Sequence, residues 1–163
     1  MKIAISGTHG VGKSTAVYKK AYEYKLKYPD KKLSIVSESA RDCPLPINKE
    51  ASRNSQKWMI NYQIIKEIEA ENTSDIVISD RSIMDYMAYA KYLFPDLFDI
   101  YRNLIKNHIN TYDKIFYMQV KNNNYLISDG VRDTDPEFQK IIDDTLRNLY
   151  EDFKDDIKEI IIE

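Results

Sequence analysis

The chain has 163 residues, of which 43% are hydrophobic and 31% charged, and its formal net charge at pH 7 is −2. This length fits one domain with a single core, and the small net charge excludes a global field that would draw the protein to nucleic acid or to a membrane surface. No apolar stretch approaches the roughly 20 residues that span a bilayer, and the single cysteine, Cys43, allows no internal disulfide, so we expect one cytoplasmic domain over residues 1–163 with no membrane partner.

The first apolar run, Lys2–Ser6, leads directly into a complete phosphate-binding loop. Its G-x-x-x-x-G-K-S pattern places glycines where the backbone must curl with its N–H groups inward, and the next helix adds its positive N-terminal end. Lys13 can reach the terminal phosphates of a nucleotide, and the Ser14 hydroxyl can hold Mg²⁺. The side chain of His9 could face the substrate. The residues assigned to nucleotide binding are Gly7, Thr8, His9, Gly10, Val11, Gly12, Lys13, Ser14 and Thr15.

Strand-like runs alternate with helical patterns along the chain. The predicted strands are Lys2–Ser6, Leu33–Ser37, Ile76–Ser79, Ile115–Gln119 and Glu159–Ile162. Apolar residues at helical spacing predict helices over residues 14–24, 55–71, 82–92 and 95–110, and a last helix that ends near residue 153. Over 55–71 the apolar residues at this spacing are Trp58, Ile60, Ile64, Ile65 and Ile68. The last helix begins either with Asp135 as a cap before Pro136 or with Thr134 and Glu137 as a capping box. The alternation predicts a three-layer α/β/α P-loop NTPase fold, with helices on both faces of a five-stranded parallel sheet.

The second predicted strand is followed by an acid and a base that could act on substrate. Ligands in folds of this kind bind at the C-terminal ends of the strands. The carboxylate of Glu38 can accept a proton from a substrate hydroxyl or hold Mg²⁺ through water. Arg41 can contact a phosphate or pair with Glu38. The alternative for both residues is a solvated surface pair.

The third predicted strand leads into Asp80 and Arg81. An apolar run that ends in an acid is typical of a Walker B element, so Asp80 would hold Mg²⁺ through water, or act as the base if Glu38 does not. Arg81 could stabilise charge on a transferred or acceptor phosphate. Asp80 could also cap the following helix, and such a cap is compatible with catalysis.

The irregular segment over residues 120–135 is expected to form a lid. Asp129 and Gly130 predict a turn, and Arg132 could then close over the γ-phosphate to stabilise the transition state. The alternative for Arg132 is a surface pair with Asp133 or Asp135.

Aromatic residues on the helix predicted over 55–71 have two interpretations. Trp58 and Tyr62 could stack on the ring or base of an acceptor, or they could face the core. The Tyr- and Ile-rich helices over residues 58–104 could likewise support a homodimer face as readily as a core. His108 is predicted to lie at the surface.

These motifs together resemble the P-loop nucleoside and nucleotide kinase superfamily, and most closely the small AAA-labelled kinase-like domains related to the nicotinamide riboside kinase domain. The resemblance rests on Gly7–Ser14, Glu38-Ser39-Ala40-Arg41, Asp80-Arg81-Ser82 and Asp129-Gly130-Val131-Arg132. The chain is also similar to thymidylate kinases and deoxynucleoside kinases. In the latter a glutamate after the second strand serves as the base, and the resemblance places that role on Glu38. The chain departs from these relatives in being shorter than typical thymidylate kinases and in having one clear lid arginine.

The preferred hypothesis is Mg-ATP-dependent phosphoryl transfer to a small nucleoside-like or nucleoside monophosphate acceptor. ATP and Mg²⁺ are the expected cofactors, with Ser14 and Asp80 holding the metal. The residues expected to act in catalysis are Lys13, Glu38, Asp80, Arg81 and Arg132. Those expected to bind the acceptor are Glu38, Arg41, Trp58, Tyr62 and Arg81. For a monophosphate acceptor, Arg41 or Arg81 would bind its phosphate.

Two other functions are alternatives to this hypothesis. A kinase of polynucleotide 5′ ends would need a basic channel, for which the first helix offers only Lys19 and Lys20. A non-catalytic ATP- or GTP-binding module is compatible with a phosphate-binding loop. A GTP switch, however, would need a guanine-reading Asn-Lys-x-Asp motif, which the sequence lacks.

Overall fold

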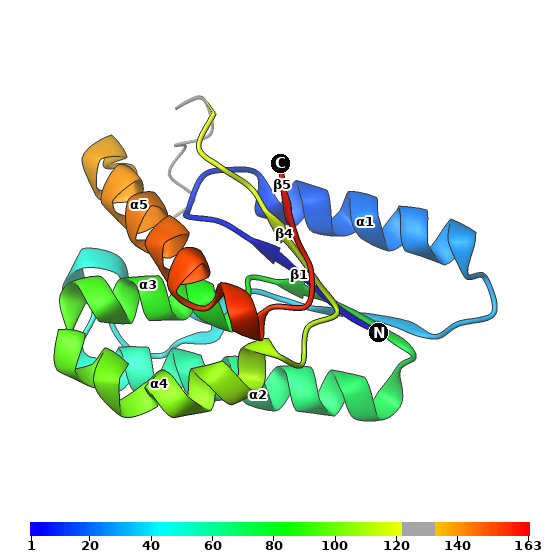
Figure 1. Ribbon diagram of the computed structural model, residues 1–163, viewed down its shortest axis with the longest axis horizontal. Coiled ribbons are helices and arrows are strands. Elements are labelled where there is room, and N and C mark those ends of the chain that lie inside the picture. The colour runs from blue at the N-terminus through cyan, green and yellow to red at the C-terminus, as the bar shows by residue number, and fades with distance from the viewer. Residues whose placement is uncertain (122–132) are drawn as a thin grey trace.

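The computed structural model describes residues 1–121 and 133–163, and within them a parallel sheet lies between two layers of helices (Figure 1). The strands are β1 (Lys2–Ser6), β2 (Leu33–Val36), β3 (Ile76–Asp80), β4 (Lys114–Tyr117) and β5 (Ile160–Ile162). Their order in the sheet is β2-β3-β1-β4-β5, and all neighbouring pairs are parallel. The predicted three-layer fold with a five-stranded parallel sheet is therefore confirmed.

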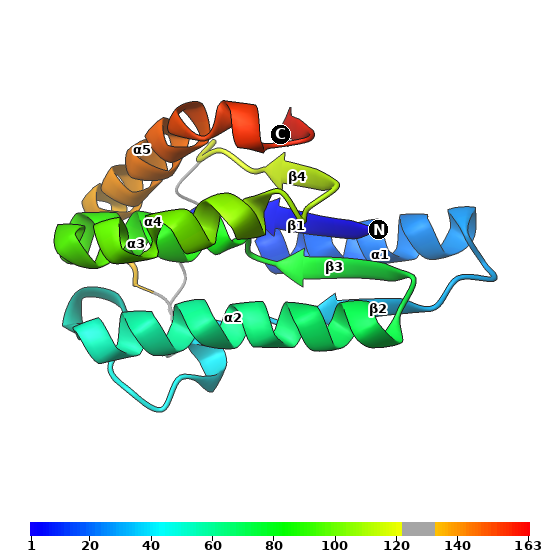
Figure 2. The ribbon, with the colours of Figure 1, turned by 60° about the horizontal axis from the view of Figure 1, so that its bottom comes forward.

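The helices divide unequally between the two faces of the sheet (Figure 2). They are α1 (Lys13–Lys27), α2 (Arg53–Thr73), α3 (Ile83–Leu93), α4 (Pro95–Ile109) and α5 (Pro136–Asp152). Ile3 and Ile5 of β1 pack with Val17 of α1 on one face, while Ala4 between them packs with the core formed by the other four helices. Every residue of β1 is buried because both faces of the central strand are covered.

Local capping sets where three of the helices begin. Ser52 caps α2 and Ser82 caps α3, each within a capping box. Asp135 caps α5, because its side chain accepts hydrogen bonds from the backbone N–H groups of Glu137 and Phe138. Of the two predicted starts for the last helix, the structure therefore has Asp135 before Pro136.

Two short 3-10 helices, η1 (Ser39–Asp42) and η2 (Asn48–Glu50), connect β2 to α2. β2 leaves the sheet after Val36, one residue earlier than predicted, and Glu38 becomes the N-cap residue of η1. β3 continues one residue further than predicted, so that Asp80 still pairs with Ile5 of β1. The sheet thus holds Asp80 directly, whereas Glu38 lies beyond the strand pairing.

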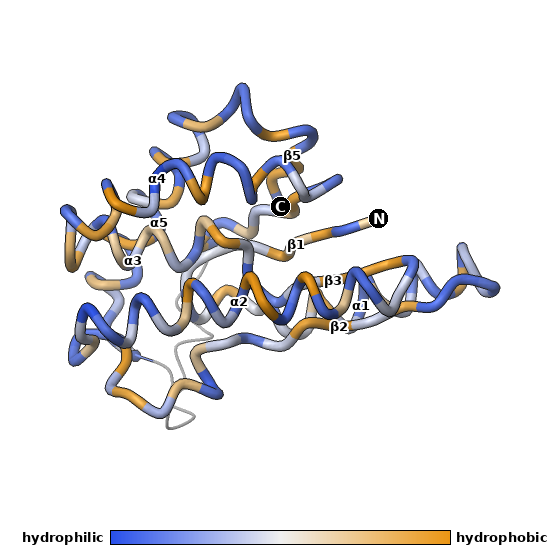
Figure 3. The backbone as a smooth tube through the Cα atoms, turned by 90° about the horizontal axis from the view of Figure 1, so that it is seen from below, coloured by the Kyte–Doolittle hydropathy of each residue, from blue (hydrophilic) through white to orange (hydrophobic). Residues whose placement is uncertain are grey.

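Apolar and polar residues alternate along α2 (Figure 3), but the buried face differs from the predicted one. Of the apolar residues at helical spacing, Ile60 is buried but Ile65 and Ile68 are exposed, and the polar residues Gln56, Gln63 and Glu67 are buried. The exposed isoleucines of α2 do not test the predicted homodimer face, which stays a prediction. Within residues 1–121 and 133–163, no helix is both long and apolar enough to traverse a lipid bilayer.

Candidate active site

The phosphate-binding loop joins β1 to α1, and its shape depends on glycine. Gly7 has a φ of 146°, and a Cβ atom there would lie 2.6 Å from the carbonyl oxygen of Met118. Gly12, the N-cap residue of α1, has a φ of 87°. Residues with side chains rarely adopt such angles, so the loop conformation requires glycine at these two positions.

Asp85 anchors the base of this loop to α3. Its Oδ1 accepts a hydrogen bond from the backbone N–H of Gly7 at 2.8 Å, and its Oδ2 accepts one from the Ser6 hydroxyl at 2.8 Å. The same carboxylate accepts from the backbone N–H of Ser82. Asp85 is not among the predicted site residues. The capping-box spacing of Ser82 and Asp85 could have indicated that this carboxylate lies at the start of α3.

Lys13 lies at the start of α1 with its side chain buried against the loop. Its Nζ donates a hydrogen bond of 2.6 Å to the carbonyl oxygen of Thr8. Burial, with the Arg81 guanidinium nearby, lowers the pKa of Lys13 to about 8. A new anionic partner near this amine would favour its charged form.

We expect nucleotide binding to be linked to proton uptake by Lys13. Bound phosphates would raise the pKa of Lys13 above its value of about 8 in the free protein, so at about pH 8.5 a largely neutral amine would take up a proton. Affinity should fall as the pH rises through this range. Titration calorimetry with Mg-ADP in buffers of different ionisation enthalpy measures the uptake. It should shrink at about pH 7, where Lys13 is already charged, and its absence at about pH 8.5 would contradict the assignment.

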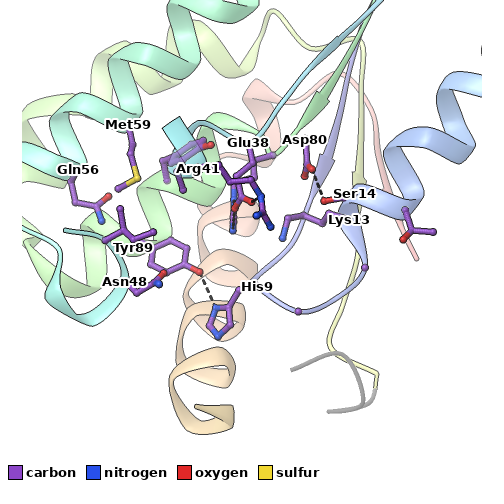
Figure 4. Close-up of a pocket in the computed structure, with 17 residues that line it drawn as sticks. His9, Lys13, Ser14, Glu38, Arg41, Asn48, Gln56, Met59, Asp80 and Tyr89 are labelled. Carbon is purple, nitrogen blue, oxygen red and sulfur yellow. Dashed lines mark hydrogen bonds and ion pairs between the residues drawn. The ribbon is translucent and has the colours of Figure 1, made fainter. Parts of the chain in front are cut away.

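Ser14 and Asp80 form a polar pair beside Lys13 (Figure 4). The Ser14 hydroxyl donates a hydrogen bond of 2.8 Å to Asp80 Oδ2. Asp80 Oδ1 is buried without a hydrogen-bond partner among the described residues, and burial together with the nearby Glu38 raises the pKa of Asp80. A hydroxyl and an incompletely satisfied carboxylate are hard oxygen donors, so this pair fits Mg²⁺, which usually keeps several waters and binds through few protein ligands.

Glu38 is held between two arginines. Arg81 Nε donates a hydrogen bond of 2.6 Å to Glu38 Oε1, and Arg41 Nε lies 3.3 Å from Glu38 Oε2. Burial alone would raise the pKa of Glu38, but the charges of Arg81 and then Lys13 overcome it and lower this pKa to about 2. The carboxylate is therefore ionised at neutral pH, and Glu38 lines the same cavity as Lys13.

The backbone of Arg81 is strained. Its φ of 91° is rare for a residue with a side chain and costs about 1–3 kcal/mol. The guanidinium is buried between Glu38 and Asp85, and the rings of Tyr86 and Tyr89 lie within cation–π distance. Such backbone strain persists only where the surrounding contacts stabilise it, and it is common at functional sites.

One cavity connects the phosphate-binding loop to the helices beyond it. Figure 4 shows Lys13, Ser14 and Asp80 at one end and Gln56 and Met59 at the other. Six of the nine predicted loop residues line it: His9, Gly10, Gly12, Lys13, Ser14 and Thr15. Among the rest, Thr8 is buried and its hydroxyl donates toward the carbonyl oxygen of Gln139. The Nδ1 atom of His9 lies 2.9 Å from the Tyr89 hydroxyl.

Residues 2–161 match the model of a protein family described as an AAA domain. The chain belongs to this family. No curated protein matches the sequence. The AAA domain protein has the fold of P-loop nucleoside and nucleotide kinases, as three solved structures illustrate.

A deoxyadenosine kinase from M. mycoides with bound dATP is 20% identical with a TM-score of 0.71, covering 100% of this chain and 90% of that one. A thymidylate kinase from Ehrlichia chaffeensis is 19% identical with a TM-score of 0.72, covering 100% and 91%. A thymidylate kinase from Candida albicans is 16% identical with a TM-score of 0.67, covering 99% and 82%.

In this AAA domain protein, the cavity brings together Lys13, Glu38, Arg41, Asp80 and Arg81, which come from three separate segments of the chain. Arg132 lies outside the described residues. Residues 120, 121 and 133–135 are the described part of the expected lid segment.

Trp58 and Tyr62 lie outside the cavity lining, so their contact with an acceptor stays a prediction. Their ring centroids are 4.5 Å apart, and Trp58 packs partly against the core. Gln56 and Met59 of α2 line the cavity instead. Gln56 is fully buried, and neither polar atom of its carboxamide has a hydrogen-bond partner among the described residues. No sequence motif marks such a residue, so only the fold could reveal it.

Proposed function

We propose that this AAA domain protein transfers the γ-phosphoryl group of Mg-ATP to a hydroxyl of a small nucleoside-like acceptor. The observation that carries the proposal is the ionised carboxylate of Glu38, placed between the phosphate-binding loop and a cavity that extends to Gln56. The kinase fold and the AAA domain family are consistent with this activity.

The nucleotide half of the site would hold ATP through the loop amides and Lys13. Ser14 and Asp80 would hold Mg²⁺ beside the β- and γ-phosphates. When bound there, Mg²⁺ would neutralise charge on those phosphates. Lys13 would approach the same phosphates from the start of α1, after exchanging its contact with Thr8 for a phosphate oxygen.

The acceptor half would present a hydroxyl to Glu38. A carboxylate with a pKa of about 2 is a weak base, so its main task would be to orient the hydroxyl and to take its proton late in a loose transition state. The new bond forms between the acceptor oxygen and the γ-phosphorus, and the bond from that phosphorus to the bridging oxygen of ADP breaks. Arg81, next to Glu38, would neutralise charge on the transferred group.

A nucleoside fits the charges of the acceptor half better than a monophosphate does. Arg41 and Arg81 both pair with Glu38, so an acceptor phosphate would have to compete for them. Gln56 and Met59 lie at the far end of the cavity, and neither is charged (Figure 4). A buried carboxamide can donate and accept at once, as the edge of a nucleobase requires.

Replacing Gln56 with methionine should therefore weaken acceptor binding selectively. We expect the KM for the acceptor to rise about 5- to 100-fold, the range for loss of a bidentate base contact, with little change in the KM for ATP. Asn61→Ala is the matched control, because Asn61 lies on α2 but is exposed and outside the cavity. Steady-state kinetics for both substrates give the comparison. Equal acceptor KM values in Gln56→Met and the native protein would exclude this contact.

A coupled ADP-release assay with Mg-ATP tests the proposal across nucleosides, deoxynucleosides, their monophosphates and nicotinamide riboside. We expect nucleoside-type acceptors to stimulate release. Stimulation by monophosphates alone would assign an acceptor phosphate to Arg41 and Arg81. Stimulation only by an oligonucleotide with a free 5′ end would favour a polynucleotide kinase, and silence with ATP binding intact would favour a non-catalytic module.

A further inference from the structure

The two carboxylates of the site are supported differently by the sheet. The β2–β3 pairing ends at Val36 and Ser79. Asp80 is still held by β1, whereas Glu38 follows the point at which β2 leaves the sheet. Some contact outside the strand ladder must therefore fix the position of Glu38 relative to Asp80.

Gln63, in the middle of α2, makes such a contact. Its side chain is fully buried. Its Oε1 accepts hydrogen bonds from the Ser39 hydroxyl at 2.7 Å and the Tyr86 hydroxyl at 3.2 Å. Its Nε2 donates to the Ser79 hydroxyl at 2.7 Å and to Glu67 Oε1 at 2.7 Å. The carboxamide thus uses two donors and two acceptor sites, which is its full hydrogen-bonding capacity.

The partners of Gln63 flank the two carboxylates. Ser39 directly follows Glu38, and Ser79 directly precedes Asp80. The backbone N–H of Ser39 also donates to the Tyr86 hydroxyl at 2.9 Å, so η1 is tied to α3 as well as to α2. One buried side chain therefore connects the backbone segments that carry both acids.

Glu67 fixes which way the carboxamide of Gln63 points. Burial would raise the pKa of Glu67, but a hydrogen bond from His108 and the charge of Lys2 lower it. The ionised carboxylate can only accept, so the amide group of Gln63 must face it and the carbonyl must face Ser39. His108 Nε2 lies 2.8 Å from Glu67 Oε2, which also explains why this histidine is buried and not at the surface as predicted.

We infer that Gln63 is a positioning residue that sets the separation of Glu38 and Asp80 for phosphoryl transfer. The inference rests on the proposed function, because it assigns Gln63 a role in that reaction. Gln63 does not line the cavity itself, although its partner Tyr86 does, and it acts on the two acids through Ser39 and Ser79. Small displacements of reacting groups are costly, and about 1 Å can reduce a rate 100-fold.

The test compares Gln63→Met, which keeps the length of the side chain but removes its hydrogen bonds, with Ser39→Ala, which removes one of them. Tyr117→Phe is the control. It deletes a buried hydrogen bond of 2.9 Å that Tyr117 of β4 donates to Asp143 of α5, and β4 is separated by β1 and β3 from β2, after which Glu38 follows. Each variant is measured for thermal stability, ATP affinity, and kcat and KM with the acceptor that the native protein prefers.

We expect Gln63→Met to lower kcat about 10- to 100-fold with ATP affinity nearly unchanged, and Ser39→Ala to lower it less. Tyr117→Phe should lose similar thermal stability with kcat unchanged. If the native protein is active and Gln63→Met keeps its kcat, the inference about Gln63 is wrong but the proposed function stands. If Gln63→Met does not fold, an unchanged kcat in Ser39→Ala would do so. An inactive native protein would overturn the proposed function and this inference with it.

Discussion

Lys13→Ala is expected to abolish phosphoryl transfer, with a loss in kcat of at least about 1,000-fold, the upper range for removal of one preorganised charge contact. Lys13 is the cation at the start of α1 whose buried amine currently binds a carbonyl oxygen of the loop itself. With alanine there, the β- and γ-phosphates would lose their closest positive side chain from the loop. ATP binding by fluorescence or calorimetry and ADP release measure the two parts of the effect.

The control for this substitution is Lys19→Ala, because Lys19 is an exposed lysine on the same helix. It should retain full activity and ATP affinity. If Lys13→Ala folds and retains turnover comparable to Lys19→Ala, then the nucleotide phosphates do not occupy the loop in the way proposed.

Glu38→Gln should reduce kcat about 100-fold or more while ATP binding is largely kept, as expected for a group that handles the acceptor proton. The amide can still accept a hydrogen bond from the acceptor hydroxyl, but it carries no charge and cannot take up the proton. The measurement is kcat with saturating acceptor, together with the dissociation constant for ATP. Unchanged turnover would exclude Glu38 as the base and favour Asp80 for that role.

Stability must be monitored in this variant because Glu38 neutralises the buried guanidinium of Arg81. Removing one partner of a buried ion pair commonly costs about 3–5 kcal/mol. Part of this cost should be offset here, since Asp85 Oδ1 lies 3.6 Å from Arg81 Nη1. Arg41→Gln serves as a comparison, because it removes a more exposed partner of the same carboxylate. A loss of kcat at a temperature where Glu38→Gln is fully folded can be assigned to chemistry.

The fold and the phosphate-binding loop could be predicted because their signals are local. Buried parallel strands are apolar along their whole length, and the loop needs glycine at positions such as Gly7 and Gly12 for backbone reasons alone. Glu38, Asp80 and Arg81 could be proposed because parallel strands bring their C-terminal ends to one edge of the sheet.

The inner face of α2 could not be predicted from hydropathy. Periodicity assigns apolar residues to the core, and it therefore selected Ile65 and Ile68, which the structure exposes. Gln63 and Glu67 are buried because their polar atoms find partners on η1, β3 and α4. These hydrogen-bond partners come from distant parts of the chain, so the hydropathy pattern of the helix cannot indicate them.

The most direct test of the central claim follows the phosphoryl group itself. The protein is incubated with Mg²⁺, the acceptor identified by ADP release, and ATP labelled in its γ-phosphoryl group, and the products are analysed by mass spectrometry. We predict that the label appears as a phosphate ester on the acceptor hydroxyl, in amounts equal to the ADP formed. Label found only in inorganic phosphate, or retained in ATP with every acceptor, would contradict the account.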